Sequence, residues 1–95
     1  MKFSELKQES RGFQCYELLK AQIAVENLKP LCCVRIDSAK KSLFIIRCKS
    51  KRKKTFVKKC FVVDRWEAPF FLNWIGLDFP FLEYKHFVEE KGNKC

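Results

Sequence analysis

The hydrophobic pattern of this chain changes its period near Pro30, and this change limits the possible folds more than any other feature. Between Phe13 and Asn27, apolar residues recur every three or four positions, as on one side of an amphipathic helix. Pro30 disfavours helical geometry in the residue before it, so we expect the helix to end there. The residues that follow have the alternating pattern of strands.

Three runs rich in β-branched and aromatic residues follow the helix, and they predict three strands at Leu31 to Ile36, Ser42 to Lys49 and Thr55 to Val63. Their connections are short and polar, which favours an antiparallel meander. Lys58 and Lys59 interrupt the alternation of the third run and predict a bulge or an edge position there. Alternation also predicts two shared faces, one with Cys32, Val34 and Ile36 and one with Phe44, Ile46 and Cys48.

The last third of the chain predicts one or two further helices. Pro69 suits the first turn of a short helix that ends at Gly76. Asp78 can cap a second helix from about Phe79 to Lys91. The buried side of that second helix would carry Phe81, Tyr84 and Val88.

These elements predict one α+β domain over residues 1–95. Its three-stranded antiparallel sheet is flanked by an N-terminal helix and by one or two C-terminal helices, in α-β-β-β-α order. The economical arrangement places the helices on one face of the sheet and leaves the other face open.

The positive charge of the chain is concentrated on one stretch. The formal net charge is +9, from 20 basic and 11 acidic residues. Ten basic residues and no acidic residue lie between positions 40 and 59, so the rest of the chain is almost neutral. These ten are the predicted polyanion-binding residues: Lys40, Lys41, Arg47, Lys49, Lys51, Arg52, Lys53, Lys54, Lys58 and Lys59.

Like charges on neighbouring strands repel one another, and a polyanion would relieve that repulsion. The leading hypothesis is therefore a non-enzymatic module that binds the phosphates of DNA or RNA through a basic hairpin. The alternative is an inhibitor or adaptor, of phage or viral type, that docks on an acidic protein surface. The plainer interpretation is that the lysines keep the protein soluble and protect a sheet edge, and anionic lipid is a further counterpart.

Eight of the fourteen aromatic residues lie between Trp66 and Val88. Most of them should cover the sheet. Any surplus could form a homodimer or partner interface, or stack on unpaired bases. The candidates for this aromatic interface are Trp66, Phe70, Phe71 and Trp74.

Signals of catalysis, of a cofactor or of a metal site are missing from the sequence. His86 is the only histidine, no Cys-x-x-Cys spacing occurs, and three glycines cannot form a glycine-rich phosphate loop. The chain also lacks an apolar export signal and a membrane-spanning run, which predicts a cytoplasmic protein with reduced cysteines. Residues 51–54 resemble a nuclear import signal and would predict a nuclear location in a eukaryotic cell. We expect three of the cysteines to be core residues: Cys32, Cys48 and Cys60.

Residues 10–60 resemble the core of the PD-(D/E)XK nucleases and Holliday-junction resolvases. In that family an acidic residue and a Glu-x-Lys motif hold a metal ion and activate water. Asp37 matches the acidic residue and Lys49 matches the lysine, but Arg47 stands in place of the second carboxylate. Divalent-metal binding needs both carboxylates, so the resemblance implies an inactive, degenerate relative.

The predicted order of elements is also similar to that of the double-stranded-RNA-binding fold. That family has a lysine-rich motif at the start of its final helix. The corresponding residues 78–83 are apolar and acidic in this chain, so the resemblance extends to topology and not to phosphate contacts.

Overall fold

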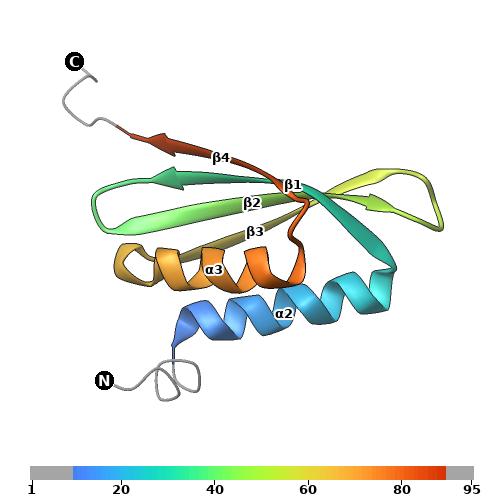
Figure 1. Cartoon of the computed structure of the whole chain (residues 1–95), viewed down its shortest axis with the longest axis horizontal. Coiled ribbons are helices and arrows are strands. Elements are labelled where there is room, and N and C mark those ends of the chain that lie inside the picture. The colour runs from blue at the N-terminus through green and yellow to red at the C-terminus, as the bar shows by residue number, and fades with distance from the viewer. Residues whose placement is uncertain (1–9, 90–95) are drawn as a thin grey trace.

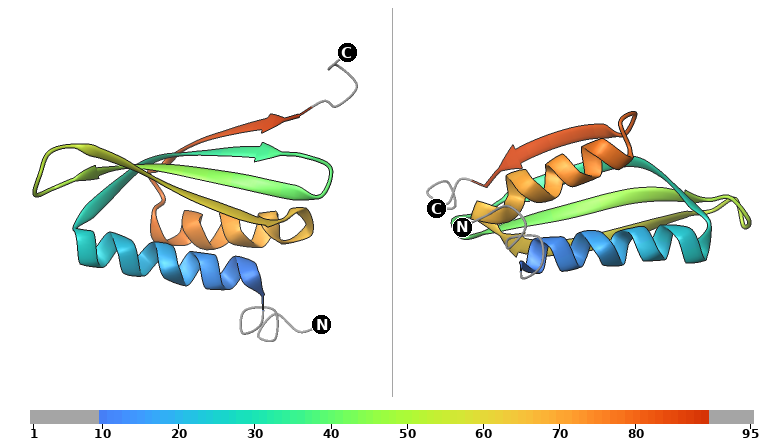
Figure 2. Two further views of the ribbon diagram at one scale, coloured as in Figure 1. Left: turned by 180° about the vertical axis from the view of Figure 1, so that it is seen from behind. Right: turned by 60° about the horizontal axis from the view of Figure 1, so that its bottom comes forward.

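The computed structural model describes residues 10–89, which form an α+β fold with two helices on one side of a four-stranded mixed sheet (Figure 1). The first helix, α2 (Arg11–Glu26), is followed by three consecutive strands: β1 (Leu28–Asp37), β2 (Lys41–Ser50) and β3 (Phe56–Asp64). A short 3-10 turn, η1 (Arg65–Glu67), leads into α3 (Ala68–Asp78), and β4 (Glu83–Val88) is the last element. The predicted α+β class and the placement of both helices on one sheet face are confirmed (Figure 2).

The sheet has the strand order β3-β2-β1-β4. The pairs β1–β2 and β2–β3 are antiparallel, as predicted, whereas β4 runs parallel to β1. The predicted edge position of Lys58 and Lys59 is confirmed, because β3 forms one border of the sheet.

The prediction of a second C-terminal helix from Phe79 is wrong within the described residues, and its end at Lys91 lies outside them. The chain leaves α3 after Asp78, turns at Pro80 and forms β4. β1 would otherwise present an unpaired row of backbone groups, and β4 satisfies that row from Cys32 to Asp37. Tertiary pairing therefore outweighs the local helical pattern. In consequence Phe81 is 97% exposed rather than buried.

Helix α2 begins and ends with side-chain and backbone capping. The Ser10 hydroxyl accepts a hydrogen bond from the Phe13 backbone N–H, and Asn27 ends the helix in the left-handed conformation. Asn27, and not Pro30, is thus the stop signal, and Pro30 lies inside β1. Proline has no backbone N–H to donate to a neighbouring strand. Pro30 lies before Cys32, where the pairing with β4 starts, so the β1–β4 pairing loses no donor.

An irregularity in the β1–β2 register between Pro30 and Cys32 changes the side-chain alternation of β1. Leu28 is buried before it, whereas Cys33 and Asp37 are buried after it. Cys32, Val34 and Ile36 share a face, as predicted, but it is the open face of the sheet.

The cysteine prediction holds only for Cys48, which is fully buried. Cys33 occupies the core position on β1, whereas Cys32 is half-buried and Cys60 is exposed on β3. All five cysteines within residues 10–89 are free thiols, and Cys95 lies outside this range.

The core lies between the helices and the sheet and is built around Phe71 of α3. The Phe71 ring centroid lies 4.5 Å from that of Phe44 on β2 and 6.0 Å from that of Phe61 on β3. Helix α2 adds the fully buried Leu19, and α3 adds the fully buried Ile75. This cluster joins both helices to the same sheet face.

The carboxylate of Glu67 fastens the start of α2 to η1. Glu67 is buried and accepts a hydrogen bond from the backbone N–H of Gly12, in the first turn of the helix. A negative charge is favourable there because the N-terminus of a helix carries partial positive charge. A Cβ atom on residue 12 would lie 2.6 Å from the Glu67 Oε1 atom, so a larger residue would force the Glu67 carboxylate to move.

We expect Phe71→Ala to lower the free energy of unfolding by about 3–5 kcal/mol, since it removes a buried ring and leaves a cavity. Urea denaturation monitored by circular dichroism measures the change. Phe81→Ala is the matched control, because that ring is exposed, and it should change stability by less than about 0.5 kcal/mol. Similar losses for both variants would contradict the assigned core.

Candidate nucleic-acid interface

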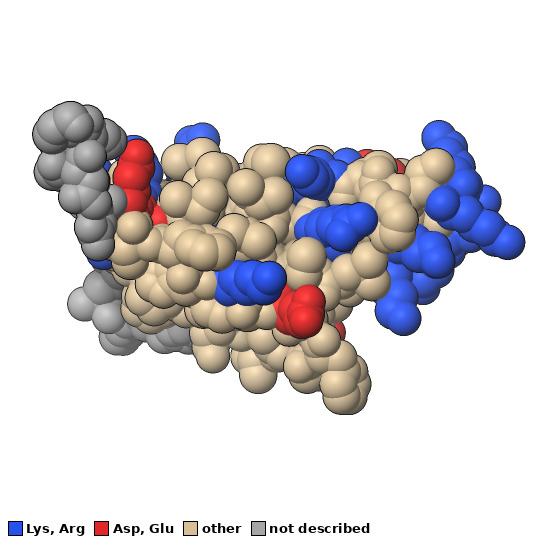
Figure 3. Space-filling view, turned by 90° about the horizontal axis from the view of Figure 1, so that it is seen from above, with Lys and Arg blue, Asp and Glu red and all other residues tan. Residues whose placement is uncertain are grey.

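Seven of the ten predicted polyanion-binding residues gather around the β2–β3 hairpin, which extends beyond the end of α2 (Figures 1 and 3). The turn places four consecutive basic residues at its tip, and all four are exposed. The adjoining strands contribute exposed basic side chains on the open sheet face. We call this set the basic hairpin: Arg47, Lys49, Lys51, Arg52, Lys53, Lys54 and Lys58.

Hydrogen bonds from Ser50 and its neighbours hold the tip in place. The Ser50 carbonyl accepts from the Lys54 N–H at 2.9 Å, and the Ser50 hydroxyl accepts from the Lys53 N–H at 3.1 Å. The Lys51 N–H donates to the Asn27 carbonyl at 3.0 Å, which fastens the tip to the end of α2. These hydrogen bonds fix the backbone of the tip, from which the basic side chains extend.

Lys54 adopts a φ of 57°, in the left-handed region that glycine occupies at least cost. A lysine there adds a fourth consecutive charge to the tip at a small conformational cost. Sites that tolerate such strain are often functional, and this observation agrees with a role for the charge.

The basic side chains on the strands are arranged by cross-strand pairing. Arg47 pairs with Lys58, and Lys49 pairs with Phe56. The Arg47 guanidinium lies over the Phe56 ring, with Cζ 4.4 Å from the ring centroid. This cation–π contact holds the guanidinium against the sheet while leaving its charge exposed.

No member of the basic hairpin forms a salt bridge with a carboxylate of residues 10–89. The structure separates the other three predicted residues from this set. Lys59 points to the helix side and pairs with Glu26 at 2.9 Å. Lys40 and Lys41 lie at the opposite end of β2, where Lys41 pairs with Asp64 at 2.6 Å.

The four aromatic residues proposed as an interface do not form one exposed surface. Phe71 and Trp74 belong to the buried core, and Phe70 is half-buried against it. Trp66 alone of the four is exposed. Most of these rings instead pack in or against the core that covers one face of the sheet.

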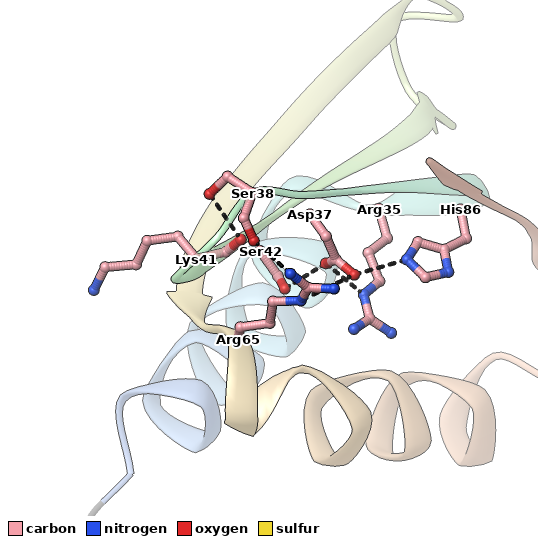
Figure 4. Close-up of polar contacts among 7 residues, drawn as sticks. All are labelled: Arg35, Asp37, Ser38, Lys41, Ser42, Arg65 and His86. Carbon is pink, nitrogen blue, oxygen red and sulfur yellow. Dashed lines mark hydrogen bonds and ion pairs between the residues drawn. The ribbon is translucent and has the colours of Figure 1, made fainter. Parts of the chain in front are cut away.

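A second polar cluster surrounds Asp37, which is fully buried at the end of β1 (Figure 4). Its Oδ1 atom accepts hydrogen bonds from the Ser42 hydroxyl at 2.6 Å and from the Arg35 Nε at 2.9 Å. Its Oδ2 atom lies 2.8 Å from His86 Nε2 and 3.6 Å from Arg65 Nε. One carboxylate thus joins β1, β2, β4 and the start of η1.

Burial alone would raise the pKa of Asp37. The hydrogen bonds from Ser42, His86 and Arg35 outweigh that effect and lower the pKa to about 2. The Asp37 carboxylate is therefore ionised at neutral pH, and its contacts with Arg35, Ser42 and His86 join three strands of the sheet.

The prediction missed this cluster because it ended the first strand at Ile36, before Asp37, and included His86 in a helix from Phe79 to Lys91. One sequence signal was available. Arg35 and Asp37 are two positions apart, and such residues share a face if β1 continues through Asp37.

The residues that carry the nuclease resemblance are not brought together. Asp37 pairs with Ser42, whereas Lys49 pairs with Lys29 at the other end of β2. Lys49 lies seven positions along β2 from Ser42, which is about 23 Å of strand. Within residues 10–89 no group of three or more His, Cys, Asp or Glu side chains is placed to hold a metal ion. The order of elements also differs from that of the double-stranded-RNA-binding fold, because a further strand, β4, follows the last helix.

Comparison with known proteins yields no assignment: no protein-family model, no curated protein and no solved structure matches the chain. Of the helices between residues 10 and 89, none has the length and apolar character needed to cross a bilayer.

We predict that acid will destabilise the fold through Asp37. Its pKa is lower in the folded state than the ordinary 3.8, so its contribution is complete above pH 4 and is lost as the pH falls towards 2. Asp37→Asn should lower the free energy of unfolding at pH 7 by about 3 kcal/mol, because it leaves Arg35 without its charged partner. It should also flatten the pH dependence between pH 4 and pH 2, which urea denaturation across that range measures.

Asp64→Asn is the control for this prediction, since it removes an exposed carboxylate that pairs with Lys41. Solvent screens exposed pairs, so its effect should be clearly smaller. Equal effects of the two substitutions would disprove the special role of Asp37.

Proposed function

We propose that this protein binds nucleic acid, without catalysis, through the phosphate contacts of the basic hairpin. The observation that carries the proposal is the group of seven exposed basic side chains, none of which pairs with a carboxylate of the described residues. Each phosphate that such a group neutralises releases condensed counterions, which drives binding and makes it sensitive to salt.

The contacts are to the backbone of the nucleic acid rather than to base edges. Five of the seven residues are lysines at the tip or beside it, and flexible ammonium groups act as point charges. The hairpin extends past the helices, so it can lie in a groove or across a strand without a clash with α2.

Two double substitutions of equal charge test the proposal: Arg52→Glu with Lys53→Glu, and Lys40→Glu with Lys41→Glu. Both change the formal charge by the same amount, and all four residues belong to the stretch singled out by sequence. The first pair should weaken binding to a fluorescent 20-base-pair duplex or 20-nucleotide single strand by at least tenfold. The second pair lies at the far end of β2 and should weaken it by less than about threefold.

The measurement is fluorescence anisotropy across a series of KCl concentrations. In the wild type, log affinity should fall linearly with log salt, and loss of two phosphate contacts should reduce the slope by about 2 on a duplex. The fourfold variant in which Lys51, Arg52, Lys53 and Lys54 become Glu should not bind. Equal losses from both double variants would mean that net charge acts without the hairpin, and would refute the proposal.

An acidic protein surface is the other counterpart that this charge could meet. The 260/280 nm absorbance ratio of the purified protein, before and after a high-salt wash, distinguishes a nucleic-acid partner from an acidic protein partner. A ratio that is high before the wash and falls after it supports nucleic acid, whereas a protein-like ratio throughout supports an acidic protein.

A further inference from the structure

The open face of the sheet changes character halfway along its strands. At the end remote from the basic hairpin, six apolar side chains from all four strands share this face. We call them the apolar patch: Val34, Ile36, Leu43, Ile45, Val62 and Phe87. Figure 3 looks onto this face, where an uncharged area lies beside a few separate charged side chains and Lys and Arg gather at the hairpin end.

The strand register makes the apolar patch continuous. One row crosses the sheet from Phe87 through Ile36 and Leu43 to Val62, since each is paired with the next. A second row contains Val34 paired with Ile45. Val62 is 45% exposed and Phe87 is 54% exposed, so the edges of the first row remain open to solvent.

A sheet face that serves only to meet water is expected to carry polar side chains, because alternation places polar residues on the outside. The hairpin end of this face obeys that rule with Arg47, Lys49 and Lys58. The two rows of the apolar patch do not, although they belong to the same strands. Contiguous apolar surface of this kind on a soluble domain marks an interaction site.

The border of the apolar patch is mainly basic. Arg47 and Lys58 face the same side on β2 and β3, and Lys85 does so on β4. Glu83 is the acidic exception on β4, and Asp64 at the far end is paired with Lys41. An acidic partner complements this border, whereas a second copy seated on the patch would bring another mainly basic border to it.

The shape of the face fits a helix. Four strands span about 14 Å from the first to the last, and a helix with its side chains is about 10–12 Å wide. The opposite face is already covered by α2 and α3 (Figure 2). A helix on the open face would complete a three-layer arrangement of helix, sheet and helix.

We propose that the open sheet face docks an amphipathic helix of a partner protein, whose apolar stripe covers the apolar patch and whose flanking Asp and Glu side chains meet Arg47, Lys58 and Lys85. This site is distinct from the tip of the basic hairpin, and it does not require that the tip bind nucleic acid.

Synthetic helical peptides of about 18 residues, about 27 Å of helix, test the proposal with the full-length protein. The first peptide has leucines on one face and glutamates on the flanks. The second has the same composition in an order that gives no apolar face, and the third has lysines in place of the glutamates. Fluorescence anisotropy at about 150 mM salt, which screens long-range attraction, should show the first peptide binding at least tenfold more tightly than either control.

The double variant Leu43→Thr with Val62→Thr makes two paired positions of the apolar patch polar without adding charge, and threonine keeps its preference for strands. It should weaken the binding of the first peptide at least tenfold. The matched control is Val25→Thr with Leu77→Thr, which alters two exposed apolar residues on the helices and should have no effect on binding. Thermal unfolding verifies that both variants are folded.

The outcomes separate this proposal from the one for the hairpin. The Arg52→Glu with Lys53→Glu variant should keep its affinity for the first peptide within about threefold while losing nucleic acid. Equal binding of the first two peptides would mean that charge alone attracts them, and would overturn the proposal. Absence of peptide binding would also overturn the proposal. Light scattering gives a further test. If the wild type is a dimer and the Leu43→Thr, Val62→Thr variant is a monomer, the occupant of the apolar patch is a second copy and the proposal is wrong.

Discussion

The structure depends on the packing of both helices against a single face of the sheet. Phe71 is central to this packing, since its ring contacts Phe44 and Phe61 from a helix that also contributes Ile75 to the core. In a chain of 95 residues the apolar surface available for burial is small, and this layer uses most of the aromatic rings. The opposite face and both faces of β4 stay open as a direct result.

The separation of charge follows from the same architecture. The body of the protein is nearly neutral and pairs some of its carboxylates with cations, as in Lys41–Asp64 and Lys59–Glu26. The basic hairpin extends beyond the helices, where no carboxylate of residues 10–89 reaches it. Full exposure to water limits the self-repulsion of its lysines, and it also leaves their charge available to an anion.

Asp37 illustrates how a residue that resembles a catalytic one can serve the fold. It is the acidic residue that matches the nuclease pattern, yet four neighbouring side chains surround its two oxygens. A buried carboxylate is costly unless it is paired and hydrogen-bonded, and this one has both kinds of partner. Through His86 it also fastens β4, the strand with the fewest buried side chains, to the rest of the sheet.

The local patterns of the chain were sufficient to predict α2, the three antiparallel strands, the start of α3 and the concentration of charge, because these depend on periodicity and on neighbours in sequence. Tertiary structure decided what depends on distant partners. The segment after Pro80 became a strand because β1 offered it an unpaired edge, and the bulge near Pro30 determined which side chains of β1 face the core. Register then divided the ten basic residues into a group of seven and three outliers, and it assembled the apolar patch from four strands. Sequence alone determined that a basic segment exists, whereas the pairing of the strands decided where its charges lie, since cross-strand neighbours are set by hydrogen-bond register and not by proximity in the chain.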